Sequence, residues 1–258
     1  MTSEEKSCAA AFLDLADDYV SGGFKRPHGR YTFTDGPANN GQTAEPQMND
    51  GDSLQAVAAD IASCSRCGLC SARTHTVPGE GAAVPLVMVI GEGPGADEDA
   101  SGRPFVGRAG QLLDRMLDSQ GKIGLSRAAN CYIANIVKCR PPGNRNPQTD
   151  EITACLPFLL RQIKILKPKV ILAAGNTAAK ALLDSTEGIT RLRGIFTVFR
   201  GARMDLQFNI PLLPTFHPSA LLRDETLKAP VWNDMKILRQ KLCELDADYA
   251  GRMADIPL

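Results

Sequence analysis

Short apolar runs of strand type alternate with helical patterns along most of this chain, and this alternation is the feature that most limits its fold. The strand-type runs fall at residues 85–90, 131–137, 169–174 and 210–214. The helical patterns fall at residues 111–117, 149–166, 177–183 and 229–245. Strands that alternate with helices form a mostly parallel sheet covered on both faces. We therefore predict an α/β fold, a three-layer αβα sandwich around a central, mostly parallel four-stranded sheet.

Three loops of this predicted sheet hold the most unusual sequence in the chain. They follow Ile90, Val137 and Pro214. The carboxyl ends of parallel strands lie at one edge, where such sheets bind their ligands. We therefore expect the three loops to share one rim. Residues 195–199 read instead as an antiparallel strand, and Thr149 or Asp150 as the cap of the helix that follows.

The first 52 residues differ in composition from the rest. Residues 21–52 are rich in Gly, Pro, Asn, Gln and Asp and show no sustained period, which predicts a flexible linker. Before them, residues 1–20 carry apolar side chains at helical spacing, namely Phe12, Leu15, Ala16 and Tyr19. We therefore divide the chain into an N-terminal extension, residues 1–52, and one folded domain, residues 53–258.

The formal net charge of zero hides an uneven distribution. Residues 1–60 hold 4 Lys or Arg against 10 Asp or Glu, which leaves 25 against 19 in residues 61–258. The body is mildly basic, which permits phosphate binding without requiring it. The sequence has no run of 18 apolar residues and does not begin with a signal-peptide pattern. We expect a cytoplasmic monomer that makes no membrane contact.

Three separated motifs lie in the loops after the predicted strands. The first is Gly91-Glu92-Gly93-Pro94-Gly95, followed by Glu98-Asp99 and by residues 102–107, GRPFVG. The second is residues 138–147, KCRPPGNRNP, and the third is residues 217–223, HPSALLR. In this order they resemble the signatures of the family 4 (iron–sulfur, thermophile-type) uracil-DNA glycosylases, and the resemblance covers about residues 60–245. It implies a base excision repair enzyme that flips uracil out of DNA and hydrolyses its N-glycosidic bond, leaving an abasic site.

Eight cysteines in a chain expected to lie in a reducing compartment favour metal or cluster ligation over disulfides. The resemblance implies that four of them hold a [4Fe–4S] cluster: Cys64, Cys67, Cys139 and Cys155. Judged by spacing, the same thiolates suit tetrahedral zinc equally well. Cys70 extends the run to C-x2-C-x2-C and is an alternative ligand, although we expect it to be a bystander.

The resemblance also implies a pocket for the flipped base, whose Watson–Crick edge such enzymes read. Phe105 would stack on uracil, and the Asn135 amide, which both donates and accepts, would pair with it. Backbone N–H groups of Gly91 and Gly93 would surround the base, since glycine lets the chain approach a ligand closely. The alternatives are that Phe105 is a core side chain beside a turn and that Asn135 caps the next turn.

Cleavage leaves negative charge on the departing uracil and oxocarbenium character on the sugar. The resemblance implies that His217 hydrogen-bonds the uracil anion, a form of electrostatic stabilisation. It implies that Glu92 positions the attacking water and faces the sugar, both suitable tasks for a carboxylate. The alternatives are a structural histidine and a loop carboxylate without a role.

Loops around the same rim are expected to hold the DNA through contacts that do not read its sequence. Leu221 or Leu222 would wedge into the space left by the flipped base. The expected phosphate contacts come from one hydroxyl and four basic side chains: Ser219, Lys138, Arg140, Arg145 and Arg223.

Three other readings stay open at this point. The domain is alternatively a non-catalytic module that binds uracil-DNA or a replication protein, a redox protein, or a relative that traps DNA covalently through a histidine. Residues 142–147 contain no histidine, so we predict turnover. The N-terminal extension is a candidate docking segment for a replication or repair protein.

Overall fold

One mixed sheet of six strands organises the computed structural model, which describes residues 52–118, 121–200 and 209–257. The strands are β1 Glu80–Gly81, β2 Val87–Gly91, β3 Cys131–Asn135, β4 Val170–Ala174, β5 Thr197–Arg200 and β6 Asn209–Thr215. Their order is β1-β3-β2-β4-β6-β5. The inner four are parallel, whereas β1 and β5 pair antiparallel at the two edges. The predicted four-stranded parallel sheet is confirmed as the centre of a larger one.

The helices lie close to the predicted helical patterns. The longer ones are α2 Leu54–Ala62, α4 Arg108–Asp118, α5 Thr149–Leu166, α6 Asn176–Leu183 and α9 Lys228–Leu245. The shorter ones are α3 Ala96–Ser101, α7 Ile189–Leu192, α8 Pro218–Arg223 and α10 Ala247–Met253, with 3-10 turns η1 Gly68–Ser71, η2 Pro142–Asn144 and η4 Glu225–Leu227.

The predicted cap of α5, Thr149 or Asp150, was wrong by one or two positions. Gln148 is the N-cap residue, and its backbone N–H donates to the carboxylate of Glu151 at 2.7 Å. Thr149 and Asp150 already belong to the first turn. The carboxylate therefore satisfies a backbone donor that the helix itself cannot pair.

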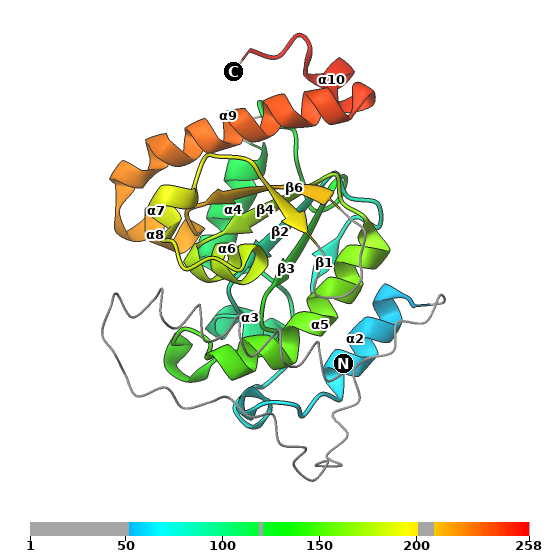
Figure 1. Cartoon of the computed structure of the whole chain (residues 1–258), viewed down its shortest axis with the longest axis vertical. Helices are drawn as coiled ribbons and strands as arrows, with labels where there is room; N and C mark the ends of the chain where they lie inside the picture. The colour runs from blue at the N-terminus through cyan, green and yellow to red at the C-terminus, as the bar shows by residue number, and fades with distance from the viewer. Residues whose placement is uncertain (1–51, 119–120, 201–208, 258) are drawn as a thin grey trace, which may run out of the picture. The chain divides into compact units, whose positions relative to one another are not determined.

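Alternate residues of the strands supply two separate cores, one on each face of the sheet. Met88 and Ile90 of β2 pack with α2, α5 and α6, whereas Val87 and Val89 pack with α4, α8, α9 and α10. Figure 1 shows α9 and α10 on one side of the sheet and α2 and α5 on the other. The three-layer sandwich is therefore confirmed.

The inner strands bring their carboxyl ends to one edge in register. Gly91 of β2 lies beside Asn135 of β3, and Ala174 of β4 lies beside Thr215 of β6. The loops that follow these four residues therefore meet, which places the three predicted motifs on one rim.

The first helix of the described residues is capped at its start. The Ser53 hydroxyl oxygen accepts the N–H of Ala56 at 3.1 Å, which starts α2. The predicted N-terminal helix and nearly all of the linker, residues 1–51, lie outside the described residues.

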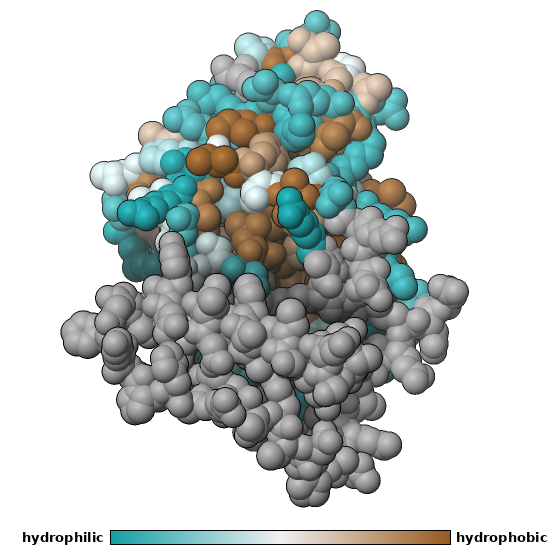
Figure 2. Space-filling model, in the orientation of Figure 1, coloured by the Kyte–Doolittle hydropathy of each residue, from teal (hydrophilic) through white to brown (hydrophobic). Residues whose placement is uncertain are grey.

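The visible surface mixes polar and apolar side chains, and some large apolar ones are exposed (Figure 2). One large apolar residue that is exposed is Val198 on the edge strand β5, at 42%. Within the described ranges, no helix has the length and apolar character needed to span a bilayer.

Candidate active site

A cavity of about 560 Å³ lies at the carboxyl edge of the parallel strands. It is formed by the loops after β2, β3, β4 and β6. Eight of the predicted site residues line it: Glu92, Gly93, Phe105, Asn135, Arg145, His217, Ser219 and Arg223. Segments that lie more than 100 residues apart in the chain therefore meet around one hollow.

Asn135 is the last residue of β3, and its side chain is almost fully buried, at 1% exposure, while it lines the cavity. Its Oδ1 is the one buried side-chain nitrogen or oxygen in the described ranges that has no hydrogen-bond partner. Leaving such an acceptor unsatisfied costs roughly 1–3 kcal/mol. A ligand that brings an N–H donor would recover this cost, so the unpaired atom indicates a binding site and argues against a turn cap.

Gly91 permits the close approach of the two side chains beneath the cavity. A Cβ at this position would lie 2.5 Å from Asn135 Oδ1 and 2.5 Å from Phe105 Cζ. Any larger residue would displace the amide or the ring. Gly91 therefore acts on the pocket through the space that it leaves.

Phe105 reaches the cavity in an unusual backbone conformation, with φ at 53°, and its side chain is 6% exposed. Its ring lies 5.4 Å from the ring of His217, tilted by 32°. The two rings occupy neighbouring parts of the cavity wall, so a planar ligand on Phe105 would also meet His217.

His217 is held as a neutral ring in a defined tautomer. Its Nδ1 accepts the backbone N–H of Ser219 at 3.1 Å, so this nitrogen carries no proton and Nε2 is the donor. Burial, together with the nearby positive charge of Arg223, lowers its pKa to about 4. The side chain therefore offers one N–H donor and no charge near neutral pH.

Glu92 follows β2 directly and lines the cavity. One of its carboxylate oxygens accepts a short hydrogen bond from the Thr177 hydroxyl, in the first turn of α6. This contact fixes the carboxylate, while the remaining oxygen lone pairs stay available for water or a positive centre.

The predicted phosphate contacts divide into three groups. Arg223 and Arg145 line the cavity, although Arg145 is also paired with the Glu151 carboxylate at 2.6 Å. Arg140 does not line it and donates to Asn144 at 2.8 Å. The expectation for Lys138 was wrong, because this side chain is 1% exposed and points into the protein.

Two further expectations at α8 are modified by the structure. The Ser219 Oγ lies 2.8 Å from His217 Nδ1, so its hydroxyl proton points to the histidine and its predicted phosphate bond would compete with that contact. Leu221 is 1% exposed and belongs to the core, whereas Leu222 is 39% exposed. Of the two wedge candidates, only Leu222 is accessible to DNA.

The cysteines that the resemblance singled out gather around a second, smaller hollow. It is lined by Cys64, Cys67, Cys139 and Cys155, and also by Cys70. In the described ranges, no three His, Cys, Asp or Glu side chains are arranged so that they could hold a metal ion between them. Burial raises the pKa of the Cys155 thiol to about 11.

The surroundings of these sulfur atoms fit a thiolate-bound cluster. Arg73 donates from Nη1 to Cys139 Sγ at 3.2 Å, and the Lys138 backbone N–H donates to Cys155 Sγ at 3.2 Å. The buried Lys138 ammonium lies in the same wall. Hydrogen bonds and positive charge stabilise the negative charge that thiolates and their clusters carry.

Sequence reasoning missed the loop after β4. Gly175 and Asn176 line the cavity, and a Cβ on Gly175 would lie 3.0 Å from the Cβ of His217. The rule that ligands bind at strand carboxyl ends pointed to this loop, but it holds no charged residue that draws attention. Thr177 and Arg127, which contacts the Phe105 carbonyl, gave no sequence signal at all.

Comparisons with known proteins agree with this arrangement. The family model described as Uracil DNA glycosylase superfamily matches residues 78–236. The chain is 41% identical to the type-4 uracil-DNA glycosylase of Sulfurisphaera tokodaii, over 73% of this chain and 84% of that protein. It is 42% identical to the type-4 enzyme of Pyrobaculum aerophilum, over 70% and 91%, and 42% identical to that of Thermotoga maritima, over 67% and 85%.

Proposed function

Because this chain belongs to the uracil-DNA glycosylase superfamily, among its type-4 members, we propose that the cavity beside Asn135 receives the uracil that the enzyme removes from DNA. The reaction is hydrolysis of the N-glycosyl bond of uracil in DNA repair. The unpaired, buried Oδ1 of Asn135 in the cavity wall is the observation that carries the assignment of the pocket.

Asn135 and Phe105 would recognise the base. Uracil presents an N–H between two carbonyl oxygens, and a carboxamide complements that edge because it accepts and donates side by side. Cytosine presents an acceptor next to an amino group. An amide held in the orientation that suits uracil would then face acceptor with acceptor and donor with donor. The Phe105 ring supplies a stacking surface, which is favourable for any base.

His217 would stabilise the departing uracil. Negative charge develops on the uracil oxygens as the glycosidic bond breaks, and the Nε2–H of a neutral imidazole can donate to one of them. A preorganised donor of this kind is worth roughly 2.7–4 kcal/mol in the transition state. The bond from the Ser219 N–H to Nδ1 keeps the donor on the correct nitrogen.

Glu92 would act on the sugar side of the bond. Its carboxylate accepts a hydrogen bond from the attacking water and attracts the positive charge of the oxocarbenium-like sugar. The hydroxyl of Thr177 holds the carboxylate in place. The water oxygen then bonds to the sugar carbon from which the uracil anion departs, and the water passes a proton to the Glu92 carboxylate.

DNA contacts are proposed around the mouth of the cavity. Arg223, Arg145 and Arg140 would supply charge toward phosphates. Ser219 remains a secondary phosphate donor, and Leu222 is proposed to fill the gap left by the flipped base.

We propose a [4Fe–4S] cluster for the second hollow, held by Cys64, Cys67, Cys139 and Cys155, with Cys70 as the alternative ligand. Four thiolates are the usual ligand set for such a cluster, and zinc is the alternative that the donor set allows. A structural role fits, because Cys64 and Cys67 precede η1 whereas Cys155 lies in α5, so that a bound cluster would link these two segments. The N-terminal extension is proposed to dock on a repair or replication protein, and the enzyme to act as a cytoplasmic monomer.

The pocket is tested by excision from a labelled oligonucleotide with a single uracil, followed by alkali to break abasic sites. Under single-turnover conditions, His217→Ala and Asn135→Ala should each lower the rate by roughly 10²–10³-fold. His75→Gln is the control, since His75 does not line the cavity. Full activity in both pocket variants would refute the assignment, and no cleavage by iron-loaded wild-type protein would favour the non-catalytic module.

A further inference from the structure

Phe105 has a backbone conformation that a bulky residue adopts only when its surroundings impose it. Its φ is 53°, in the left-handed region that glycine prefers. Such strained residues persist where neighbouring groups determine the backbone from several sides, and they concentrate at functional sites. The contacts around residues 104–107 identify those groups.

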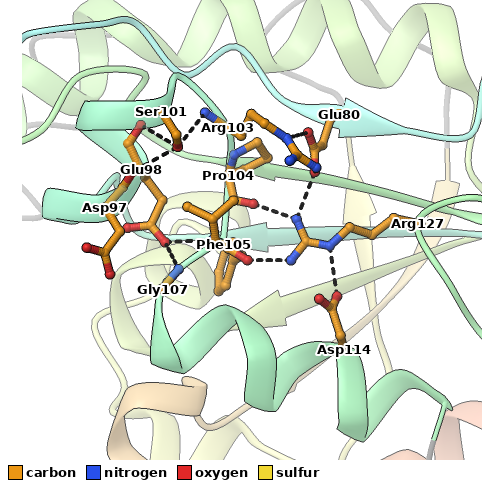
Figure 3. A network of polar contacts seen from close by, with 11 residues as sticks. Glu80, Asp97, Glu98, Ser101, Arg103, Pro104, Phe105, Gly107, Asp114 and Arg127 are labelled. Carbon is orange, nitrogen blue, oxygen red and sulfur yellow. Dashed lines mark hydrogen bonds and ion pairs between the residues drawn. The ribbon is translucent and has the colours of Figure 1, made fainter.

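The carbonyl side of this segment is held by Arg127 (Figure 3). Nη1 of Arg127 donates to the Pro104 oxygen at 2.5 Å, and Nη2 donates to the Phe105 oxygen at 2.5 Å. The planar guanidinium thus binds two successive carbonyls with a fork that no other side chain offers.

Arg127 is itself oriented by two carboxylates. Its Nη1 contacts Glu80 at 3.0 Å and its Nε contacts Asp114 of α4 at 2.8 Å, and its side chain is only 17% exposed. Glu80 also binds the side chain of Arg103, which is 65% exposed (Figure 3). The guanidinium therefore has little freedom to leave Phe105.

The amide side is held by Glu98. Its Oε1 accepts the N–H of Val106 at 2.8 Å and that of Gly107 at 3.0 Å. Its Oε2 accepts the N–H of Gly95 at 3.0 Å, which ties the segment to the loop after β2. Figure 3 shows Glu98 and Arg127 on opposite sides of Phe105.

Helix α4 packs against the same peptide group. A Cβ on Gly110 would lie 1.7 Å from the Phe105 oxygen, so the helix backbone leaves no space beside that carbonyl. The carbonyl is therefore confined between the helix and the Arg127 fork, which holds the backbone of Phe105 in its left-handed conformation.

We propose that Arg127 is a positioning residue for uracil recognition, which acts by holding Phe105, together with Glu98, in the conformation that turns its ring toward the cavity. This inference rests on the proposed function, in which Phe105 stacks on the flipped base. Without the fork, the peptide after Phe105 can rotate out of the left-handed region, and the ring then leaves the stacking position.

The free energy of one base–aromatic stack sets the size of the defect expected when Arg127 no longer holds Phe105. Loss of a base–aromatic stack corresponds to about a 5- to 150-fold change in binding. Arg127→Gln should therefore lower the single-turnover excision rate roughly tenfold, within the lower part of that range, and weaken inhibition by free uracil by a similar factor. Arg103→Gln, which breaks only the outer contact to Glu80, should change neither quantity.

A double-mutant cycle separates positioning from a general structural role. If Arg127 acts through the ring, Arg127→Gln should have little further effect in a Phe105→Ala background. Multiplying defects would overturn the inference, as would full activity of Arg127→Gln while Phe105→Ala is impaired. Unimpaired Phe105→Ala would instead remove the proposed stacking role on which the inference rests.

Arg127→Lys guards against a variant that fails to fold. Lysine keeps a positive charge between Glu80 and Asp114, but one ammonium cannot replace the planar fork on two carbonyls. It should melt close to the wild-type temperature and still show weakened inhibition by uracil. Wild-type inhibition in a folded Arg127→Lys protein would show that charge, and not the fork, is what matters.

Discussion

One side chain at the cavity carries a polar atom that the protein itself leaves unused. Asn135 Oδ1 is buried in the cavity wall and has no hydrogen-bond partner. Buried polar groups are normally paired, so this acceptor indicates a ligand that donates to it. Uracil, which has N–H donors and carbonyl acceptors, meets this requirement.

The titration of His217 provides a prediction at this scale. Its pKa is lowered to about 4 by burial and by Arg223, whereas the unfolded chain has a value near 6.5. The ring should therefore stay neutral through pH 6–7 and take up a proton on Nδ1 only as the pH falls through about 4, which breaks its hydrogen bond from the Ser219 N–H. Histidine NMR as a function of pH measures this directly, and a pKa near 6.5 would contradict it.

The lowered pKa of His217 also makes the free energy of unfolding decrease as the pH falls. Between pH 6.5 and about 4, the unfolded chain takes up the His217 proton before the folded protein does. This contribution to the free energy of unfolding is thus complete above pH 6.5 and falls as the pH decreases, by up to about 3 kcal/mol. In urea unfolding, His217→Asn should lose that part of the pH dependence.

At the level of elements, the junction of β4 with α6 places Thr177 beside Glu92. The strand ends at Ala174, and the helix starts at Asn176, so its first turn reaches the carboxyl edge of the sheet. Gly175, with φ at 99°, makes this abrupt change of direction and leaves space for His217. One short junction therefore supports both proposed catalytic side chains.

Thr177→Val tests whether the junction positions the carboxylate. The substitution keeps the shape and removes the hydroxyl that donates to Glu92. A hydrogen bond to a charged group is worth about 1.5–3 kcal/mol, so the single-turnover rate should fall roughly tenfold or more. Affinity for uracil-containing DNA should stay unchanged. Thr177→Ser, which restores a hydroxyl, should recover most of the rate; failure to recover would argue against the hydrogen bond.

For the whole molecule, the cysteine hollow joins segments that the sheet does not hold together. The η1 region supplies Cys64, Cys67 and Cys70 around it, and α5 supplies Cys155. The segment between α2 and β1 contains little regular structure, and Leu69 of η1 is one of the few side chains that pack it on the core with α5. A bound cluster would therefore stabilise the N-terminal part of the domain most.

Loss of the proposed cluster should lower the melting temperature. Cys155→Ala should reduce iron content and the visible absorbance of the cluster, and lower the melting temperature by about 5 °C or more, since about 1 kcal/mol corresponds to 2–4 °C in a domain of this size. Cys243→Ala is the matched control, because Cys243 does not line the hollow. Stoichiometric zinc without iron would identify the alternative metal.

Much of the fold was predictable because it depends on local patterns. The spacing of apolar residues in 85–245 reflects which side chains must be buried, and it distinguishes strands from helices. Once the strands are identified, the motif loops are seen to follow their carboxyl ends. The inner parallel strands and α5 were thus predicted closely. The edge strand β1 was not, because two residues carry no period and pair only when β3 is already present.

The site was predictable where a motif names a residue type, as with Asn135 and His217, which the structure brings to one cavity. Three features depended on segments far apart in sequence: Lys138 is buried, Thr177 reaches Glu92, and Arg127 reaches the Phe105 carbonyl. A sequence specifies which groups can donate, accept or carry charge. Which of them are already paired inside the protein, and which remain for a ligand, is decided only when tertiary packing removes water and brings distant partners within hydrogen-bond distance.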